Sequence, residues 1–591
     1  MSNKIDDMAK FAKFCKDMGF IYQSSEIYGG INGFWDYGPL GVELKKNIKE
    51  AWWQDMVRNP PPGPDGQEIR MVGLDCAIIM NPKVWVASGH VGGFSDPMVD
   101  CLKCRKRFRA DKLKVIRITT VVAANKEQAN NPKRTVVARA VEADDREAIQ
   151  KALDRITVQD EKAHKSQLKA TIVTAFGAQG FEPGSPQVIE ALKNSSINVS
   201  GEAFDFTTYP RDQEITCPEP NCGGTLTEPR AFNLMNETYT GAVQSEENKA
   251  YLRPETAQGI FVNYKNVLDS TRLKLPFGIA QVGKAFRNEI NPRNYTFRSR
   301  EFEQMEIEFF CHPSESRKWY EYWRELRKNW YSTLGINSTN LIPREQGQEE
   351  LAHYSVGTTD IEYMFPFSDE PQELEGVAHR GDFDLKAHAK HSGKDLGYFD
   401  EEGWNALLQA RLTPFKDDKN RLPEEVKLRE EQKKQLEKDE KPKFSFVPHV
   451  IEPSAGADRF TLAVLCEAYH PEDVVKDASG KEEKRCVMKF HPRLAPVKAA
   501  IFPLVNKGGM DDAARELYRS LKPYFNVVYD QSGAIGRRYR RQDEAGTPFC
   551  ITVDGDTMKD GTVTIRDRDT LKQERIPKGE VRARIEAALR G

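Results

Sequence analysis

The stretch LPFGIAQVGKAFRNEINPRNYTFRSREFEQMEIEFF, residues 275–310, decides the fold of this chain. Its two ends, 278–286 and 301–310, predict two strands that are joined by a polar loop. Successive side chains of a strand point to opposite faces, so Glu306 and Glu308 share a face with Phe302, while Met305, Ile307 and Phe309 point the other way. Buried carboxylates are costly unless they have partners, so we expect this face to have a function.

The loop between the predicted strands is rich in arginine: Arg287, Arg293, Arg298 and Arg300. A guanidinium group binds phosphate through paired hydrogen bonds, and an aromatic ring such as Phe302 can stack on a base. Carboxylates on the same face can hold an ammonium group. The stretch therefore suits a nucleotide with a cationic co-substrate, and a charged, solvated hairpin is the alternative.

The pattern F-R-x-E, long loop, R-E-F resembles motif 2 of the class II aminoacyl-tRNA synthetases. The sequence segments FRNEI, REF and MEIE are similar to those of the homodimeric glycyl-tRNA synthetase branch. The segment RPETAQG at 253–259 matches the same branch, and GADR at 456–459, which follows EPS, resembles motif 3. ELEG at 373–376 stands where many members of this family have E-L-W-G, so Glu375 replaces a tryptophan that packs the pocket.

The segment GFWDYGPLG at 33–41 resembles the motif 1 region, which forms the dimer interface in that family. A helix follows, and its predicted apolar side is Val42, Leu44, Ile48, Trp52 and Val57. Closed twofold dimers are the commonest assembly of soluble proteins. We therefore expect a homodimer.

The resemblance implies an α/β (α+β) fold with a class II antiparallel sheet catalytic domain that carries insertions. From residue 494 strands and helices alternate, as in a C-terminal α/β anticodon-binding domain with a mixed sheet. Arg537, Arg538, Arg540 and Arg541 surround Tyr539 there, which favours an RNA contact over a merely solvated helix. The expected domains are 1–113, an inserted α+β module at 114–212, 213–490 with a Lys/Glu-rich insertion at 386–442, and 491–591.

The bulk composition is that of a globular protein, with 591 residues, 39% hydrophobic residues and a net charge of −2. No apolar run reaches the ~18 residues of a membrane span, and the first residues lack an apolar signal core. Cysteines are mostly isolated, as in reduced proteins. These features predict a cytoplasmic protein with no membrane partner, and they argue against a general basic coat for nucleic acid.

Two cysteine pairs form knuckles, Cys101 with Cys104 and Cys217 with Cys222. Four thiolates suit a closed, tetrahedral structural zinc site. Four free thiols in a vestigial ribbon are the alternative. Ser88, His90 and Asp96 are residues of the kinds that form hydrolase triads, but no nucleophile elbow surrounds the serine. Similar sequence segments occur in the family as a structural loop of the active site.

The resemblance implies that glycine and ATP react, with Mg²⁺, to glycyl-adenylate and that the glycyl group then passes to the 3′ end of tRNA(Gly). It implies catalytic roles for Arg287, Glu289 and Arg459. It implies ATP binding by Arg287, Asn288, Glu289, Phe297, Arg298, Ser299, Arg300, Glu301, Phe302, Glu373, Leu374, Gly456, Ala457, Asp458 and Arg459. It implies substrate binding by Arg109, Glu255, Phe302, Glu303, Gln304, Met305, Glu306, Glu452, Pro453, Ser454, Ala455 and Gly456.

Within those sets, Glu255, Glu306 and Glu452 would hold the ammonium group of glycine, while Glu373 and Glu452 would steer Mg²⁺. One rival is a non-catalytic, synthetase-like accessory subunit that binds nucleic acid. Such relatives lose the motif arginines, and Arg287 and Arg459 are both present. A ligase for another small substrate is a second rival, which the anticodon-like C-terminal module disfavours.

Overall fold

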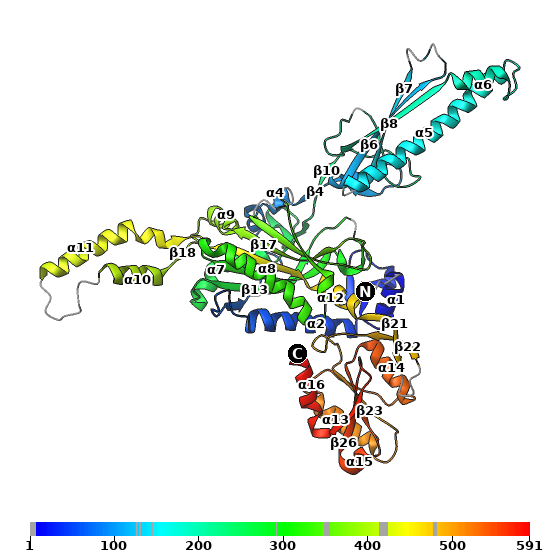
Figure 1. Cartoon of the computed structure of the whole chain (residues 1–591). Coiled ribbons are helices and arrows are strands. Elements are labelled where there is room, and N and C mark those ends of the chain that lie inside the picture. The colour runs from blue at the N-terminus through cyan, green and yellow to red at the C-terminus, as the bar shows by residue number, and fades with distance from the viewer. Residues whose placement is uncertain are drawn as a thin grey trace. The chain divides into compact units, whose positions relative to one another are not determined.

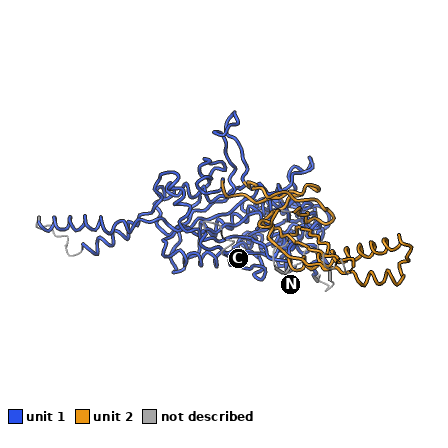
Figure 2. The backbone as a smooth tube through the Cα atoms, turned by 90° about the horizontal axis from the view of Figure 1, so that it is seen from above, with its two compact units in different colours: residues 1–91, 235–591 blue, residues 92–234 orange. Residues whose placement is uncertain are grey.

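The computed structural model describes residues 8–590 except 126–127, 129–131, 143–145, 212, 291, 348–350, 352–354, 413–422 and 477–481. The chain forms two compact units, shown in Figure 2. One contains residues 1–91 and 235–591, and the other contains residues 92–234. Among the helices within the described ranges, none combines the length and the apolar character needed to cross a bilayer.

A seven-stranded sheet forms the centre of the first unit, in the order β15-β16-β17-β20-β14-β13-β3 (Figure 1). Its strands are β3 (Arg70–Gly73), β13 (Phe277–Phe286), β14 (Glu301–Cys311), β15 (Leu341–Glu345), β16 (Gly357–Tyr363), β17 (Gln372–Gly381) and β20 (His449–Gly456). Only β3 and β13 pair in parallel, and the other neighbours are antiparallel. The predicted antiparallel sheet is confirmed.

The hairpin predicted from the opening stretch is the pair β13 and β14, with Phe277 opposite Phe310 and Gln281 opposite Glu306. Its two faces differ as the alternation predicts. Met305 and Phe309 lie in the main apolar core, where the Phe309 ring packs on Trp319 at 4.6 Å. The opposite face carries the carboxylates, and this division places the site on one side of the sheet.

Three helices cover the apolar face: α2 (Pro39–Trp53), α8 (Ser316–Thr333) and α12 (Ala457–Ala468). The aromatic side chains of α8 are packing residues, as Trp319 and Trp323 are fully buried. On α2 the predicted apolar side is only partly correct. Leu44 and Ile48 are buried, but Val42 is 51% exposed because it lies on the outer side of the helix.

The other face is covered at one end by α7 (Ala257–Thr271) and α9 (Phe383–Ser392). Phe310 of β14 packs there against Tyr264 of α7, with ring centroids 4.7 Å apart. Burial of apolar side chains at this end anchors β14. The remainder of the same face stays open and forms a cavity.

Glu375 points into the core rather than into the cavity. It accepts hydrogen bonds from Arg327 Nε at 2.7 Å and Nη2 at 3.0 Å, and from Tyr331 Oη at 2.5 Å. The two charged side chains are 0% and 1% exposed. An ion pair between β17 and α8 therefore occupies the place of the tryptophan expected from the family pattern, and Glu375 does not line the cavity.

The C-terminal part of the first unit has a mixed five-stranded sheet in the order β24-β23-β25-β26-β27. Its elements are β23 (Ala499–Pro503), α13 (Met510–Leu521), β24 (Val527–Tyr529), α14 (Ile535–Ala545), β25 (Phe549–Val553), α15 (Thr557–Asp560), β26 (Thr562–Asp567), β27 (Gln573–Pro577) and α16 (Val581–Arg590). β23 pairs in parallel with β24 and β25, while β26 pairs antiparallel with β25 and β27. The predicted mixed sheet is present.

Peripheral elements complete the first unit. They are α1 (Met8–Asp17), β1 (Ile21–Gln23), β2 (Trp35–Tyr37), α3 (Pro82–Ala87), α4 (His90–Gly93), β11 (Asn236–Tyr239), β12 (Lys249–Leu252), β18 (Tyr398–Phe399), α10 (Glu401–Arg411), α11 (Pro423–Asp439), β19 (Ser445–Phe446), β21 (Tyr469–Lys476) and β22 (Glu482–Met488). The last residues of α4 belong to the second unit. Helices α10 and α11 lie within the expected Lys/Glu-rich insertion.

The second unit combines a three-stranded sheet, β10-β4-β5, with a four-stranded sheet, β8-β6-β7-β9. Its elements are β4 (Ser95–Asp100), β5 (Arg107–Arg109), β6 (Leu113–Ala123), β7 (Lys133–Glu142), α5 (Arg146–Gly177), α6 (Pro186–Lys193), β8 (Ser196–Asp205), β9 (Ile215–Thr216) and β10 (Arg230–Asn233). This unit encloses the α+β module expected at 114–212 together with both cysteine pairs. The finer division of the chain into four domains stays a prediction.

We expect Glu375→Ala to destabilise the first unit by about 3–5 kcal/mol, because it leaves the buried Arg327 guanidinium without its counter-charge. The midpoint of urea unfolding, followed by tryptophan fluorescence, measures this. Glu321→Ala is the matched control, since Glu321 pairs with Arg317 on the exposed side of α8. Equal midpoints for the two variants would contradict a structural role of the Arg327–Glu375 pair.

Candidate active site

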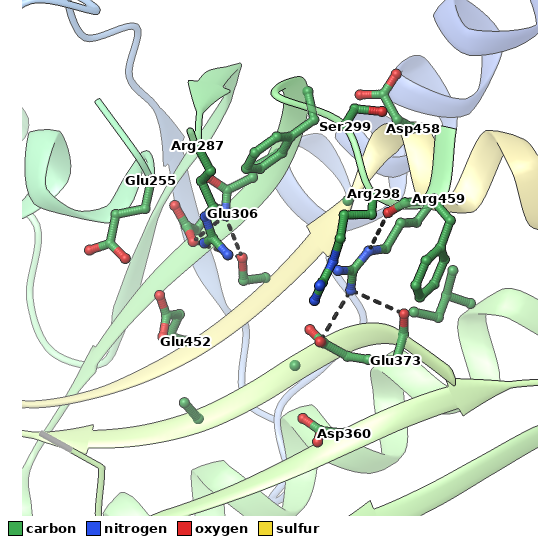
Figure 3. Close-up of a pocket in the computed structure, with 18 of the residues that line it drawn as sticks. Glu255, Arg287, Arg298, Ser299, Glu306, Asp360, Glu373, Glu452, Asp458 and Arg459 are labelled. Atoms are coloured by element: carbon green, nitrogen blue, oxygen red, sulfur yellow. Dashed lines mark hydrogen bonds and ion pairs between the residues drawn. The ribbon is translucent and has the colours of Figure 1, made fainter. Parts of the chain in front are cut away.

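The open part of the sheet's second face holds a cavity of about 370 Å³ (Figure 3). Strands β14, β16, β17 and β20, the loop after β13 and the start of α12 supply its walls. The lining residues are Glu255, Arg287, Glu289, Thr296, Phe297, Arg298, Ser299, Phe302, Gln304, Glu306, Gln346, Thr358, Asp360, Glu373, Leu374, Gly376, Ala378, Glu452, Ser454, Gly456, Asp458 and Arg459. Most of the predicted site residues therefore meet in one space.

Three arginines line the cavity: Figure 3 shows Arg298 and Arg459 together near Glu373, at its cationic end, and Arg287 on the side of Glu306. Arg459 Nη1 lies 3.1 Å from a carboxylate oxygen of Glu373, and its guanidinium is 4.7 Å from the centre of the Phe297 ring. Arg287 lies over the Phe302 ring at 5.4 Å. The charge of Arg459 lowers the pKa of Glu373, and Arg287 and Arg298 add to this effect. This end can bind a polyanion beside an aromatic surface.

The anionic end contains buried carboxylates from three segments. Glu306 is 1% exposed and accepts hydrogen bonds from Ser454 Oγ at 2.7 Å and from Thr256 Oγ1. Glu452 accepts two hydrogen bonds from Arg380 Nη1, at 2.8 and 2.9 Å. Figure 3 shows Glu255, Glu306 and Glu452 grouped at this end, away from Glu373.

These carboxylates are short of positive charge. Oxygens of Glu306, Glu308 and Glu452 lie within 4.8 Å of one another. Burial raises the pKa of Glu452 to about 8, although Arg380 favours its ionised form. Burial, followed by the charge of Glu452, raises the pKa of Glu308 well above 4.5. The cluster is therefore suited to receive a small cation such as an ammonium group.

Several predicted residues lie outside the cavity. Met305, Ala455 and Ala457 are buried in the apolar core. Met305 and Ala455 alternate along their strands with residues that line the cavity, so they point to the opposite face, and Ala457 is the first residue of α12. Glu303 turns to the helical face and pairs with Lys45 at 2.8 Å. Glu301 pairs with Lys284. The other members absent from the lining are Asn288, Arg300 and Pro453.

Two further predicted residues need separate comment. Asp458 borders the cavity, but its carboxylate accepts hydrogen bonds from Tyr37 Oη at 2.5 Å and Lys45 Nζ at 2.7 Å. It therefore ties α12 to the motif 1 segment. Arg109 belongs to the second unit, where it pairs with Asp111 at 2.6 Å.

Sequence reasoning missed the wall that β16 and Gln346, the residue after β15, provide. Gln346 donates hydrogen bonds to Asp360, at 3.0 and 2.9 Å, and Thr358 lies beside them in the lining. Burial raises the pKa of Asp360 to about 6. The alternating stretch TTDIEY could have marked this strand, but no motif singled out its polar side.

The Ser88, His90 and Asp96 set is not assembled as a triad. Ser88 Oγ lies 2.8 Å from His90 Nδ1, but His90 Nε2 faces Glu255, at 3.5 Å. Asp96 belongs to the second unit and pairs with Arg109. The structure gives no support to a hydrolase.

The four predicted cysteines converge in the second unit. Cys101 and Cys222 have sulfur atoms 3.6 Å apart, and those of Cys104 and Cys217 are 3.8 Å apart. All four sulfurs lie within 4.8 Å of one another. A tetrahedron with metal–sulfur bonds of ~2.3 Å has edges of about 3.8 Å, so the four positions fit one metal ion.

Residues 239–467 match the tRNA synthetase class II core domain (G, H, P, S and T), and residues 498–588 match the anticodon binding domain. The chain is 49% identical over 589 residues to a glycine–tRNA ligase of Rhodopirellula baltica, covering 99% of both chains. It belongs to the glycine–tRNA ligase family. A relative of the same name from Clostridium perfringens is 44% identical over 584 residues, or 98% of both chains. The family resemblance and the class II fold are confirmed, and a non-catalytic accessory subunit is not favoured.

In the first unit, we expect the stability that Glu308 and Glu452 contribute to be lost as the pH rises from about 4.5 to 8, since their raised pKa values let the native state bind more protons than the unfolded chain there. Glu308→Gln removes one such proton and should make this loss shallower. Urea midpoints from pH 5 to 8.5 measure the slope. Glu321→Gln, on an exposed face, should keep the wild-type slope, and an unchanged slope in Glu308→Gln would exclude Glu308 as a source.

Proposed function

We propose that this chain is an ATP-dependent glycine–tRNA ligase whose cavity activates glycine and then passes it to tRNA(Gly). The observation that carries the proposal is the meeting, in one cavity, of an arginine-rich end and a buried carboxylate end. A triphosphate fits the first and an ammonium group fits the second. Curated relatives of this name, similar over nearly the whole chain, support the same assignment.

In the first step a carboxylate oxygen of glycine attacks the α-phosphorus of ATP, the bond to the β-phosphate oxygen breaks, and pyrophosphate leaves. This reaction needs positioning and charge neutralisation more than a protein nucleophile. Arg287 would hold the α-phosphate, while Arg298 and Arg459 hold the tail. The rings of Phe302 and Phe297, each beside one of these arginines, offer stacking surfaces for adenine.

Magnesium would neutralise the departing pyrophosphate. The half-exposed carboxylate of Glu373, next to the arginines, fits a hard cation that also binds phosphate. Glu452 fits this role less well than its sequence position suggested, because both its oxygens are held by Arg380 at the anionic end. We therefore assign Glu452 to glycine alone.

The anionic end of the cavity would select glycine by excluding amino acids with larger side chains. Glu255, Glu306 and Glu452 would surround the ammonium group, and Ser454 is held against Glu306 by a 2.7 Å hydrogen bond. A hydroxyl group fixed there would occupy the space into which the side chain of a larger amino acid would project. Every competing amino acid is larger than glycine, so a filled wall can reject it without an editing site.

In the second step the terminal ribose hydroxyl of tRNA attacks the carbonyl carbon of the adenylate, and AMP leaves. On α14 the side chains of Arg537 and Arg540 are exposed, as a phosphate contact requires. Arg538 is different. It is 4% exposed and donates to the carbonyl oxygens of Pro503 and Gly533, so it is structural.

A homodimer through the motif 1 region is part of the proposal. Apolar side chains around this segment face solvent: Ile27 is 89% exposed, Tyr28 is 87% exposed and Val42 is 51% exposed. Such a patch is typical of a surface that a partner covers. The ten cysteines are all unpaired by disulfides, which suits the cytoplasm.

The second unit would hold one structural zinc ion. The four sulfurs offer a closed tetrahedral set at distances that fit such a site. Zinc would cross-link the segment after β4 to the segment after β9, which are over a hundred residues apart in the chain. Its role would be to stabilise this unit, since a closed set leaves no position for substrate.

The direct test is glycine-dependent ATP–pyrophosphate exchange with the purified protein. Arg287→Ala should lower the exchange rate by about 10²–10³, the typical loss for one preorganised charge donor. Arg317→Ala, an exposed arginine on α8, should leave the rate unchanged. No glycine-dependent exchange by the wild type would overturn the function, and normal exchange by Arg287→Ala would remove this residue from the site.

Elemental analysis should find about one zinc per chain, as a four-thiolate set binds a single ion. Changing Cys101 and Cys222 to Ser together should remove the metal and lower the melting temperature. Cys76→Ser provides a control, because Cys76 is far in sequence from both knuckles and lies in the first unit. Metal-free wild-type protein with unchanged stability would favour four free thiols.

A further inference from the structure

Ser88 and His90 form a buried pair that the proposed reaction leaves without a role. They are 3% and 8% exposed; Ser88 directly follows α3, and His90 is the first residue of α4. The residue between them, Gly89, has a φ of 82°, a conformation that glycine adopts readily. The tight turn brings the serine hydroxyl to within 2.8 Å of His90 Nδ1.

The imidazole ring connects this pair to the cavity. Its Nε2 lies 3.5 Å from Glu255 Oε2, and its plane meets the Trp85 ring edge-on, with centroids 5.5 Å apart. Contacts on both ring nitrogens and on the ring edge fix its orientation. Since Nε2 faces a carboxylate, this nitrogen carries a hydrogen, and Nδ1 is matched to the hydroxyl group.

Glu255 differs from its neighbours in its charge environment. Burial alone would raise the pKa of Glu255, but His90, and after it Arg380, outweigh burial and hold this pKa below its ordinary value. In contrast, burial and the charge of Glu255 raise the pKa of Glu306. Glu255 thus differs from Glu306 and Glu452, whose pKa values are raised, and His90 is the first of the groups that lower the pKa of Glu255.

We infer that His90, oriented by Ser88, is a positioning residue that aims the Glu255 carboxylate at the amino group of glycine. This inference rests on the proposed function and adds a residue to it that touches neither substrate. Gln258 Nε2 already donates a hydrogen bond to Glu255 Oε1 at 3.0 Å, whereas His90 faces Oε2, so loss of His90 should leave the carboxylate held at Oε1 and able to rotate about that contact. Glycine binding should weaken, while ATP binding at the other end should not change.

Two substitutions of His90 separate the two ring nitrogens. In His90→Gln the side-chain amide nitrogen takes the place of Nε2 and can still donate to Glu255. In His90→Asn the shorter side chain places its amide nitrogen where Nδ1 was, so that only the contact with Ser88 remains. In ATP–pyrophosphate exchange we expect His90→Asn to raise the glycine KM about ten-fold or more, the scale of one charge-assisted hydrogen bond. We expect His90→Gln to stay within about three-fold of wild type, with the ATP KM unchanged in both variants.

A double-mutant cycle shows whether the effect passes through Glu255. In a Glu255→Gln background, His90→Asn should add little to the glycine KM, because the two residues act as one unit. Equal glycine KM values for His90→Asn and His90→Gln, or fully additive effects in the cycle, would overturn the inference. Ser88→Ala, which removes only the support of the ring, should raise the glycine KM less than His90→Asn, and an unchanged value would also count against it.

The experiment distinguishes this inference from the proposed function. Absence of glycine-dependent exchange in the wild type refutes the function itself. Exchange in the wild type with no difference between the two amide variants refutes the role of His90 alone. Melting temperatures of the variants identify any loss that arises from unfolding, and the ATP KM provides an internal reference in each protein.

Discussion

Strand β14 has to bury apolar side chains on one face and carboxylates on the other, and the rest of the catalytic unit depends on this constraint. Met305 and Phe309 are held by the aromatic residues of α8, which fixes the strand against the helical layer. That packing offsets the cost of carrying Glu306 and Glu308 in the interior. Glu306 can stay there because Ser454 and Thr256 donate hydroxyl hydrogen bonds to it, whereas burial raises the pKa of Glu308 and so favours its neutral form.

The cavity separates charge along its length. Arginines gather around the loop after β13 and the start of α12, and carboxylates gather where β14 meets β20. Two substrates of opposite charge, a polyanion and a molecule with an ammonium group, would thereby be aligned before they react. The geometry also explains why no nucleophilic side chain is needed, since the two reacting groups both come from the substrates.

Local alternation was enough to predict the hairpin, its two faces and the packing role of the α8 aromatics, because these follow from a period of two or of 3.6 along one segment. Contacts between segments distant in sequence were not predictable in this way. The partners Arg380 for Glu452 and Arg327 for Glu375 depend on strand order and helix placement. Arg538 illustrates the same limit, since Arg537 and Arg540 are exposed while it is buried.

The ion pair between Arg327 and Glu375 has an evolutionary consequence. Each residue is tolerable in the core only with the other, so positions 327 and 375 are epistatic. Changing Glu375 alone to the tryptophan of the expected family pattern would leave a buried guanidinium without a counter-charge, and changing Arg327 alone would do the same to a buried carboxylate. An evolutionary change between this ion pair and a tryptophan at position 375 must therefore replace both residues nearly together. Otherwise it passes through a destabilised intermediate that substitutions elsewhere have to compensate.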